Sequence, residues 1–180
     1  KFYTHFEVDL SDSSSIEQFF LEINRRQLSI DILLNSAACL TSQYALTLPV
    51  KSAQLMVDTN LMAPFLMARG TARIMRKKKW GRILNISSMA VKLEPNGDSI
   101  YAATKAALTS LSNVMAKEFA PMGITSNTIG VTALETDMLH QLPRERVDSI
   151  ISGLPVPRLA TPDDIFNVID FLISERSSYI

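Results

Sequence analysis

The sequence predicts an α/β fold in which a parallel, doubly wound sheet carries helices on both faces. Strand-like runs alternate with helical patterns along the 180 residues, which is the order expected of β-α-β units. The strand-like runs are apolar throughout, as strands buried on both faces are. With 47% hydrophobic and 20% charged residues, the composition suffices to bury one full core. We therefore expect a single domain spanning residues 1–180.

The first part of the chain predicts a strand, a helix and a second strand. Residues 2–10 (FYTHFEVDL) are interpreted as a short strand that ends in an acidic turn. Residues 13–26 carry apolar side chains at helical spacing and follow a Ser/Asp cluster that can cap a helix. Residues 30–34 (IDILL) form a short apolar run of the kind found in fully buried strands.

The middle of the chain predicts two long helices around a third strand. Residues 50–79 are helical, with interruptions expected near Asn60 and Pro64. Residues 82–86 (RILNI) form the next buried strand. Residues 99–120 form a helix that a proline and a glycine terminate.

The last part of the chain predicts a strand over residues 124–131 and a final helix over residues 162–175. Right-handed crossovers place the helices on alternate faces, and such sheets bind ligands beyond the carboxyl ends of their strands. The chain begins in what behaves as an internal strand and stops after a helix with no closing strand. We therefore expect the sheet to be incomplete at both ends.

The charge balance and the cysteine count exclude several classes of protein. The 18 basic and 18 acidic residues cancel, which gives no electrostatic case for nucleic acid or an anionic membrane. No apolar run reaches the roughly 20 residues of a membrane span. The single cysteine, Cys39, excludes a disulfide framework and fits a reducing, cytoplasmic environment. His5 and His140 lack neighbours at metal-ligand spacing, so no metal is expected.

The most informative pair of residues is Tyr101 and Lys105, in the segment Tyr-Ala-Ala-Thr-Lys. Four residues apart near the start of a helix, their side chains share one face. An ammonium beside a phenol favours the phenolate and would lower the pKa of Tyr101 toward neutrality. The tyrosine would then be a usable proton donor and acceptor. The alternative is a surface tyrosine with an ordinary lysine one turn further on, because this spacing often occurs by chance.

Ser88 supports the chemical interpretation of Tyr101. It ends a buried strand, so its hydroxyl is expected at the ligand-binding edge of the sheet. A hydroxyl there could hydrogen-bond a substrate carbonyl oxygen that Tyr101 protonates. The alternative is a helix or turn cap, and for Ser87 that remains the better interpretation.

Several segments of the chain match, in order, the motifs of one known family. They are DILLNSAA at residues 31–38, DTNL at 58–61, GRILNISS at 81–88, and the Y-x-x-x-K pattern of Tyr101 and Lys105. In this order and at these spacings, the whole chain resembles the short-chain dehydrogenase/reductase family. Residues 134–138 and 154–164 resemble the 3-oxoacyl-acyl-carrier-protein reductases within it. The resemblance implies a Rossmann-like form of the predicted sheet.

The resemblance implies a catalytic tetrad of Asn60, Ser88, Tyr101 and Lys105. Tyr101 would be the general acid/base, and Ser88 would orient the carbonyl. Lys105 would lower the pKa of the tyrosine and hold the nicotinamide ribose. Asn60 would anchor a water in a proton relay to Lys105, although taken alone it could be a polar helix residue.

The resemblance also implies NAD or NADP as the cofactor. Asp9 and Leu10 would flank the adenine, residues 35–37 would line the adenosine ribose, and Leu134 and Thr136 would meet the nicotinamide carboxamide. The implied set is Asp9, Leu10, Asn35, Ser36, Ala37, Ile86, Tyr101, Lys105, Leu134 and Thr136. The six glycines form no G-x-G-x-x-G turn. We interpret its absence as truncation or disorder, because the turn belongs one β-α-β stretch upstream of Asp9.

The chain departs from the family pattern at two cofactor segments. Ser36 and Ala38 replace the second asparagine and the glycine of N-N-A-G, and an alanine there pushes a Cβ toward the cofactor. Residues 130–132 (GVT) stand where A-P-G is usual. Neither change touches the proton-transfer residues, so we expect altered cofactor affinity rather than lost chemistry.

These observations predict an NAD(P)(H)-dependent oxidoreductase that interconverts a carbonyl and a secondary alcohol. A 3-oxoacyl thioester is one candidate substrate, and other ketones, sugars and small alcohols stay open. The alternative is a catalytically silent nucleotide-binding or scaffolding member of the same fold, which the altered segments at residues 36–38 and 130–132 would favour.

The resemblance implies two macromolecular partners. A homo-oligomer, tetramer or dimer, would form through two helices that are apolar over more than one face. Their apolar residues are Leu61, Phe65, Ala68, Ala72, Met75, Ala106, Leu108, Leu111 and Met115. An acidic acyl carrier protein would dock on two basic positions. Lys79 occupies the first, but Met122 stands at the second, and the loss of one of the two cationic contacts should weaken docking.

Overall fold

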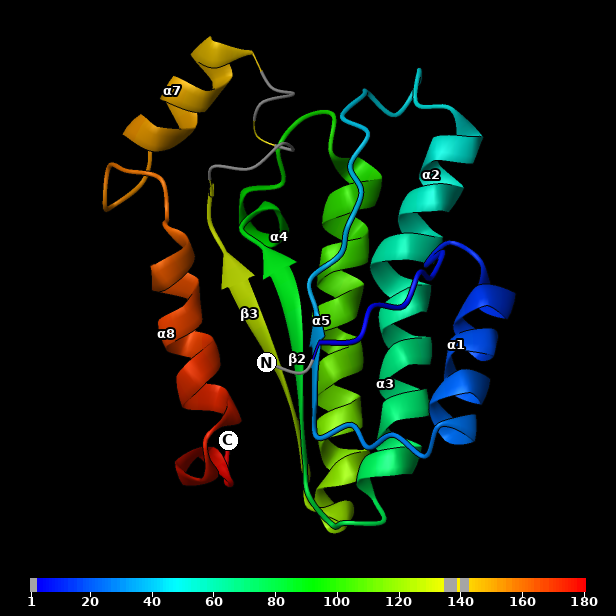
Figure 1. Cartoon of the computed structure of the whole chain (residues 1–180). Helices are drawn as coiled ribbons and strands as arrows, with labels where there is room; N and C mark the ends of the chain where they lie inside the picture. Colours follow the sequence, from blue (N-terminus) through cyan, green and yellow to red (C-terminus); the bar gives the residue numbers. More distant parts are fainter. Residues whose placement is uncertain (1–2, 135–138, 140–142) are drawn as a thin grey trace.

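A computed structural model of the chain describes residues 3–134, 139 and 143–180. Three parallel strands form one sheet in the order β1-β2-β3 (Figure 1). Their bounds are Ile32–Asn35 for β1, Gly81–Ser88 for β2 and Ile124–Val131 for β3. All of β2 pairs with all of β3, so the two strands end together at Ser88 and Val131.

Helices lie on both faces of the sheet, which confirms the predicted α/β class (Figure 1). One face carries α2, α3 and α5, with α1 against α3, and α8 packs on the other. The helices are α1 Ser13–Arg25, α2 Val50–Val57, α3 Ala63–Met75, α4 Ala90–Leu93, α5 Ser99–Phe119, α7 Arg144–Ser152 and α8 Pro162–Ile173. None of the helices in the described ranges is long and apolar enough to cross a bilayer.

Local sequence signals account for the helix boundaries. The Asp12 side chain accepts a hydrogen bond from the backbone N–H of residue 14 at 2.9 Å, a cap worth about 1 kcal/mol. Thr161 and Asp164 form a capping box at the start of α8. After α5, a short 3₁₀ turn ends at Gly123, which has a φ of 71°. The signals recognised in the sequence therefore set where these helices begin and end.

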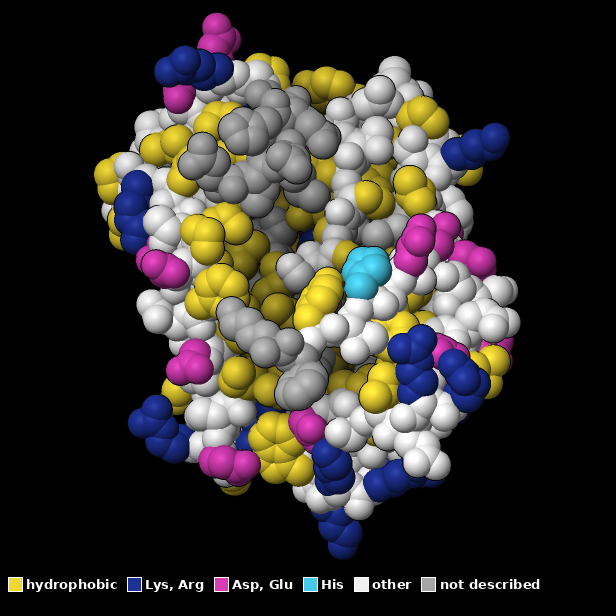
Figure 2. Space-filling view, viewed as in Figure 1, with side chains coloured by type: hydrophobic (Ala, Val, Ile, Leu, Met, Phe, Trp, Pro, Cys, Tyr) yellow, Lys and Arg dark blue, Asp and Glu magenta, His cyan; other side chains and the backbone are white. Residues whose placement is uncertain are grey.

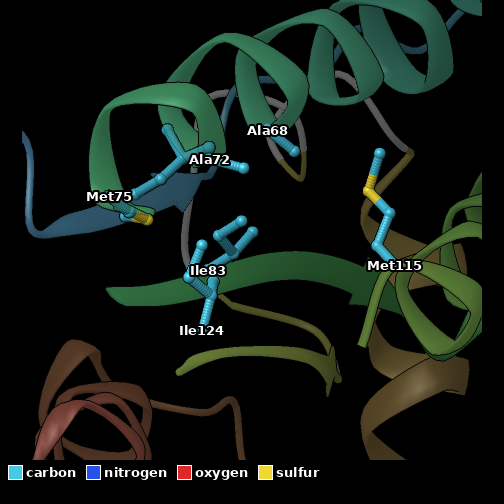
Figure 3. Close-up of a cluster of buried hydrophobic side chains, with 7 residues drawn as sticks. Ala68, Ala72, Met75, Ile83, Met115 and Ile124 are labelled. Atoms are coloured by element: carbon cyan, nitrogen blue, oxygen red, sulfur yellow. The ribbon is translucent and has the colours of Figure 1, made fainter. Parts of the chain in front are cut away.

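The main core lies between the sheet and the helices α3 and α5 (Figure 3). Ile83 of β2 points toward Ala72 and Met75 of α3 in this cluster. Because side chains alternate along a strand, the next residue, Leu84, packs instead with Leu172 of α8. Each fully buried Leu, Ile or Met contributes about 1.5–3 kcal/mol, so both clusters hold the sheet between its helices.

The strand expected over residues 2–10 is wrong. Residues 3–9 have no regular secondary structure, and most of them are exposed. A strand obtains its backbone hydrogen bonds from a neighbouring strand. None of the three described strands pairs with this segment. The apolar pattern correctly indicated a tendency to form a strand, but the described part of the chain offers this segment no strand to pair with.

The expectation that strand β1 is buried on both faces holds for one face only. Leu33 points into the main core and is 8% exposed, whereas Ile32 and Leu34 are 41% and 39% exposed. These two side chains lie on the face of the sheet opposite α3. Figure 2 shows hydrophobic side chains gathered around the hollowed centre of one face of the molecule.

The two helices expected to mediate self-association use most of their apolar residues within the chain itself. Ala68, Ala72 and Met75 of α3 and Met115 of α5 belong to the main core. Exposed apolar side chains on this helical layer include Val114, which is 49% exposed. The apolar residues of α3 and α5 are therefore largely covered by the sheet and by neighbouring helices of the same chain. Oligomer formation stays a prediction.

We predict that Gly123→Ala destabilises the fold by roughly 1–3 kcal/mol. A side chain disfavours the positive φ of Gly123, and an added Cβ would collide with the backbone carbonyl of Lys79. Gly130→Ala is the matched control, because its Cβ would meet nothing within 4 Å. Urea unfolding measures the free energy of unfolding of both variants. Equal values for the two variants would contradict the predicted collision at Gly123.

Candidate active site

A cavity of about 330 Å³ opens beyond the carboxyl ends of β2 and β3, where α/β sheets bind ligands. The ends of both strands, the first turns of α5, and residues of α4 and α7 form its walls. Most of the lining side chains are apolar. The polar side chains among them include Ser88, Tyr101 and Lys105. The structure therefore brings three of the four expected catalytic residues to one cavity.

Ser88 and Tyr101 are positioned by the end of a strand and the start of a helix. Ser88 is the last residue of β2, and Tyr101 is the third residue of α5. Both residues line the cavity, and a hydrogen bond from the Ser88 hydroxyl acts to lower the pKa of the Tyr101 phenol. Ser88 Oγ also accepts the backbone N–H of Ala90 at 3.1 Å. The serine thus serves both as a turn cap and as the neighbour of the tyrosine.

Lys105 is buried one helical turn beyond Tyr101. Its ammonium donates a hydrogen bond to the carbonyl oxygen of Ile86 at 2.7 Å and lies 5.8 Å from the centre of the Tyr101 ring. The residue is 3% exposed, and burial lowers the pKa of the Lys105 ammonium to about 8. An ammonium has three N–H donors, so two remain beyond the bond to Ile86.

The expected lowering of the Tyr101 pKa is not what the structure gives. Burial of the phenol raises the pKa of Tyr101, and the negative charges of Asp98 and Cys39 raise it further. Only the hydrogen bond from Ser88 acts in the opposite direction. Spacing along a helix predicted that Lys105 would be near, but it could not predict how strongly the surroundings exclude water.

Asn60 lies behind the cavity wall rather than in it. It is fully buried in a π-helical turn, Asp58–Met62, which confirms the helix interruption expected there. Its side chain holds the backbone of Cys39 from both sides, accepting the N–H at 2.8 Å and donating to the carbonyl at 2.9 Å. A longer contact of 3.4 Å reaches Thr104 of α5. The side chain of Asn60 therefore ties the loop after β1 to α5.

The residues expected on the adenosine side gather around a second, smaller cavity. Leu10, Asn35, Ser36 and Ala37 line a space of about 110 Å³ at the end of β1. Ser36 also lines the main cavity, so the two spaces adjoin there. Asp9 lies outside both walls. Its carboxylate accepts two hydrogen bonds from Ser11, and these lower the pKa of Asp9.

The remaining expected cofactor residues lie on the main cavity, with one exception. Ile86 and Leu134 both line it, and Leu134 pairs with Ala160 in an isolated bridge. Thr136 falls outside the described residues. Ala38 lines the cavity without a positive φ, so the alanine is accommodated without backbone strain.

Sequence reasoning missed a charged cluster at the mouth of the cavity. Asp98, just before α5, and Arg146 of α7 form an ion pair at 3.5 Å, and both line the cavity. Asp98 stands three residues before Tyr101, and this spacing in the sequence could have indicated a carboxylate near the phenol. Nothing local marks Arg146, because its contacts come from parts of the chain about fifty and a hundred residues away.

The whole chain matches one family model, described as enoyl-(acyl carrier protein) reductase, over residues 2–180. The chain belongs to the short-chain dehydrogenase/reductase family. It is 34% identical over 174 residues to the 3-oxoacyl-[acyl-carrier-protein] reductase of Aquifex aeolicus and 31% identical over 173 residues to that of Escherichia coli. These matches cover 97% and 96% of this chain and 70% and 71% of the relatives.

Solved structures of this short-chain dehydrogenase/reductase type superpose closely on the chain. A 4-hydroxyisoleucine dehydrogenase complexed with NADH gives a TM-score of 0.91 at 30% identity, covering 97% of this chain and 73% of that one. A putative gluconate dehydrogenase from Agrobacterium tumefaciens gives 0.90 at 28% identity, covering 96% and 69%. The expected family, fold class and oxidoreductase class are confirmed.

The buried lysine gives this short-chain dehydrogenase/reductase a testable pH dependence. The pKa of Lys105 falls from 10.5 to about 8 on folding, so between these values the unfolded chain binds more protons. The free energy of unfolding therefore rises with pH across this window, by up to about 3 kcal/mol relative to Lys105→Met.

Urea unfolding of the wild type and Lys105→Met, near pH 7 and near pH 10, measures this difference. Lys117→Met, which removes an exposed lysine from the same helix, is the control. If the wild type and Lys105→Met respond equally to pH, the lysine is not buried as described.

Proposed function

We propose that this short-chain dehydrogenase/reductase interconverts a carbonyl and a secondary alcohol with NAD or NADP, and that Tyr101 transfers the proton. The observation that carries the proposal is the pair of hydroxyl groups, Ser88 and Tyr101, side by side on a largely apolar wall. A carbonyl oxygen placed between them would accept hydrogen bonds from both. Charge that develops on that oxygen is stabilised most strongly where water is excluded.

The raised pKa of Tyr101 bears on its form in the resting protein. A phenol with a raised pKa stays protonated near neutral pH, which is the form that donates a proton to a reduced carbonyl. Oxidation of an alcohol would require the same phenol to lose its proton first.

The residues around the cavity fit the nicotinamide ribose end of such a cofactor. Lys105 has two N–H donors beyond its bond to Ile86, and the Tyr101 hydroxyl lines the same space. Both could bind ribose hydroxyls, while Leu134 would offer its backbone to the carboxamide. When bound, the cofactor supplies or accepts the hydride. A solved neighbour at 30% identity is described as complexed with NADH, which supports this assignment.

Asn60 could support a proton relay to Lys105 through its backbone rather than its side chain. The side-chain amide is committed to Cys39. The backbone carbonyl of Asn60 cannot receive the usual α-helical hydrogen bond, because residue 64 is a proline without an N–H. That carbonyl is the group we assign to holding a water molecule on the path to Lys105.

We predict that Tyr101→Phe lowers kcat/KM by roughly 10²–10⁴-fold with the fold intact, because only the proton-transferring hydroxyl is removed. Tyr44→Phe is the matched control, since Tyr44 is 68% exposed and does not line the main cavity. Steady-state assays of carbonyl reduction and circular dichroism of both variants measure the effect.

Near-normal activity of Tyr101→Phe would end the assignment of Tyr101. A different result would favour the catalytically silent alternative: cofactor binding by the wild type without oxidation of NADH or NADPH across a panel of ketones and acyl thioesters. The altered segment containing Ser36 and Ala38, which both line the cavity, is the feature that keeps this alternative open.

A 3-oxoacyl thioester is the substrate that we favour. Two relatives above 30% identity are named 3-oxoacyl-[acyl-carrier-protein] reductases, and the apolar cavity walls suit an acyl chain. Lys79, exposed in the turn before β2, is the cation that we assign to an acidic carrier protein. Arg158 is not assigned to carrier-protein binding, because its guanidinium already donates hydrogen bonds to the Asp164 carboxylate at 2.7 and 3.0 Å.

We predict that Lys79→Glu lowers kcat/KM for acetoacetyl-acyl carrier protein by about three- to tenfold and leaves reduction of the uncharged N-acetylcysteamine thioester of acetoacetate unchanged. An exposed cation attracts the acidic carrier protein but not an uncharged small thioester. Lys51→Glu, at an exposed site on α2, is the control. Robust turnover of an unrelated ketone with no detectable thioester reduction would remove the carrier-protein proposal and leave the oxidoreductase assignment standing.

A further inference from the structure

Three side chains from distant parts of the chain meet at the mouth of the cavity. Ser42 lies in the loop after β1, Asp98 directly precedes α5, and Arg146 belongs to α7. The Ser42 hydroxyl donates to Asp98 Oδ1 at 2.6 Å. The Arg146 guanidinium donates to Ser42 Oγ at 3.2 Å and to Asp98 Oδ2 at 3.5 Å. The cluster therefore joins three elements around one buried carboxylate, since Asp98 is 7% exposed.

The carboxylate of Asp98 stands one helical turn before Tyr101 and acts on its phenol. Its negative charge, like that of Cys39 in the loop after β1, raises the pKa of Tyr101. The other groups that face the phenol are the hydroxyl of Ser88 from β2 and the ammonium of Lys105 from α5. A change in how well the Asp98 charge is balanced must therefore change how readily Tyr101 gives up its proton.

Arg146 also makes polar contacts from α7 to three distant positions in the chain, Ser42, Asn96 and Asp98. The contact with Asn96 reaches its carbonyl at 3.4 Å. In Figure 1, α7 lies beyond the carboxyl end of β3, and Arg146 and Ile150 of α7 line the cavity.

We propose, on the basis of the proposed role of Tyr101, that Arg146 is a positioning residue for proton transfer. Its guanidinium balances the Asp98 charge beside the proton donor and makes that balance depend on the seating of α7. Apolar surroundings screen charges weakly, so an unbalanced carboxylate there acts strongly on a nearby phenol. Arg146 need not touch the substrate for this effect.

The position of α7 and the proton transfer at Tyr101 are therefore coupled. While α7 is seated, Arg146 compensates Asp98, and the phenol of Tyr101 releases its proton more readily. If α7 moves away, the carboxylate is left with Ser42 alone, and the phenol holds its proton more tightly. Proton exchange at Tyr101 is thus favoured while α7 is seated against the cavity wall.

The test is a direct titration of Tyr101 in the whole protein, followed by the ultraviolet absorbance of tyrosinate. Each protein is measured against the same protein carrying Tyr101→Phe, so the difference reports this tyrosine alone. We expect Arg146→Gln to shift the titration midpoint upward and Arg146→Lys to restore most of it. Asp98→Asn should shift it downward, and the double variant Asp98→Asn/Arg146→Gln should lie between Asp98→Asn and Arg146→Gln, because the two charges act on the phenol with opposite signs.

The structure offers matched controls for this titration. Arg144→Gln removes an exposed arginine from the same helix and should leave the midpoint unchanged. Asp98 gives α5 no side-chain cap, and an asparagine could still accept the hydrogen bond from Ser42, so Asp98→Asn should fold normally. Circular dichroism at each pH restricts the comparison to folded protein.

Two outcomes would overturn the proposal. One is an unchanged midpoint in Arg146→Gln, and the other is an unchanged or raised midpoint in Asp98→Asn. Neither depends on turnover. Full activity of Tyr101→Phe would instead overturn the proposed function and leave the charge coupling intact, so the two failures are distinguishable.

Discussion

The buried ammonium of Lys105 is the constraint on which the rest of the site depends. Its Nζ lies 2.7 Å from the carbonyl oxygen of Ile86, while its own carbonyl accepts the hydroxyl of Ser87 at 3.1 Å. Adjacent residues of β2 thus hold one residue of α5 by both its side chain and its backbone. Withdrawing a charge from water costs several kcal/mol, and the packing of α5 on the sheet must offset that cost. Tyr101, one turn away, is positioned by the same contacts.

A chain of buried side-chain hydrogen bonds aligns the strands beneath the site. Asn35 of β1 donates to Asn85 of β2 at 2.9 Å, and Asn85 donates to Ser112 of α5 at 3.2 Å. Ser112 in turn lies 2.9 Å from the hydroxyl of Ser126 in β3. Each side chain in this chain has a partner, and a buried polar group without one is costly. The network therefore favours the single register in which all three strands end beside the cavity.

Family membership and local chemistry answer different questions about this protein. The family accounts for the sheet, the oxidoreductase class and the placement of Ser88 and Tyr101. The charge balance around the phenol comes from Asp98 and Arg146, which no family motif in the sequence identified. The cavity is lined mostly by apolar side chains and carries this ion pair on its wall. The same fold can in this way give the buried tyrosine different electrostatic surroundings.

Local patterns in the sequence determined most of the elements, because they depend on neighbours in the chain. The strand over residues 124–131 and the helix beginning at Ser99 follow from apolar runs and from stop signals a few residues away. The spacing of Tyr101 and Lys105 likewise placed them on one helical face. Only the tertiary structure decided which way the pKa of Tyr101 shifts, since burial and the Asp98 charge depend on packing. The contact of Arg146 with the loop after β1 was equally beyond local signals, because it joins segments about a hundred residues apart.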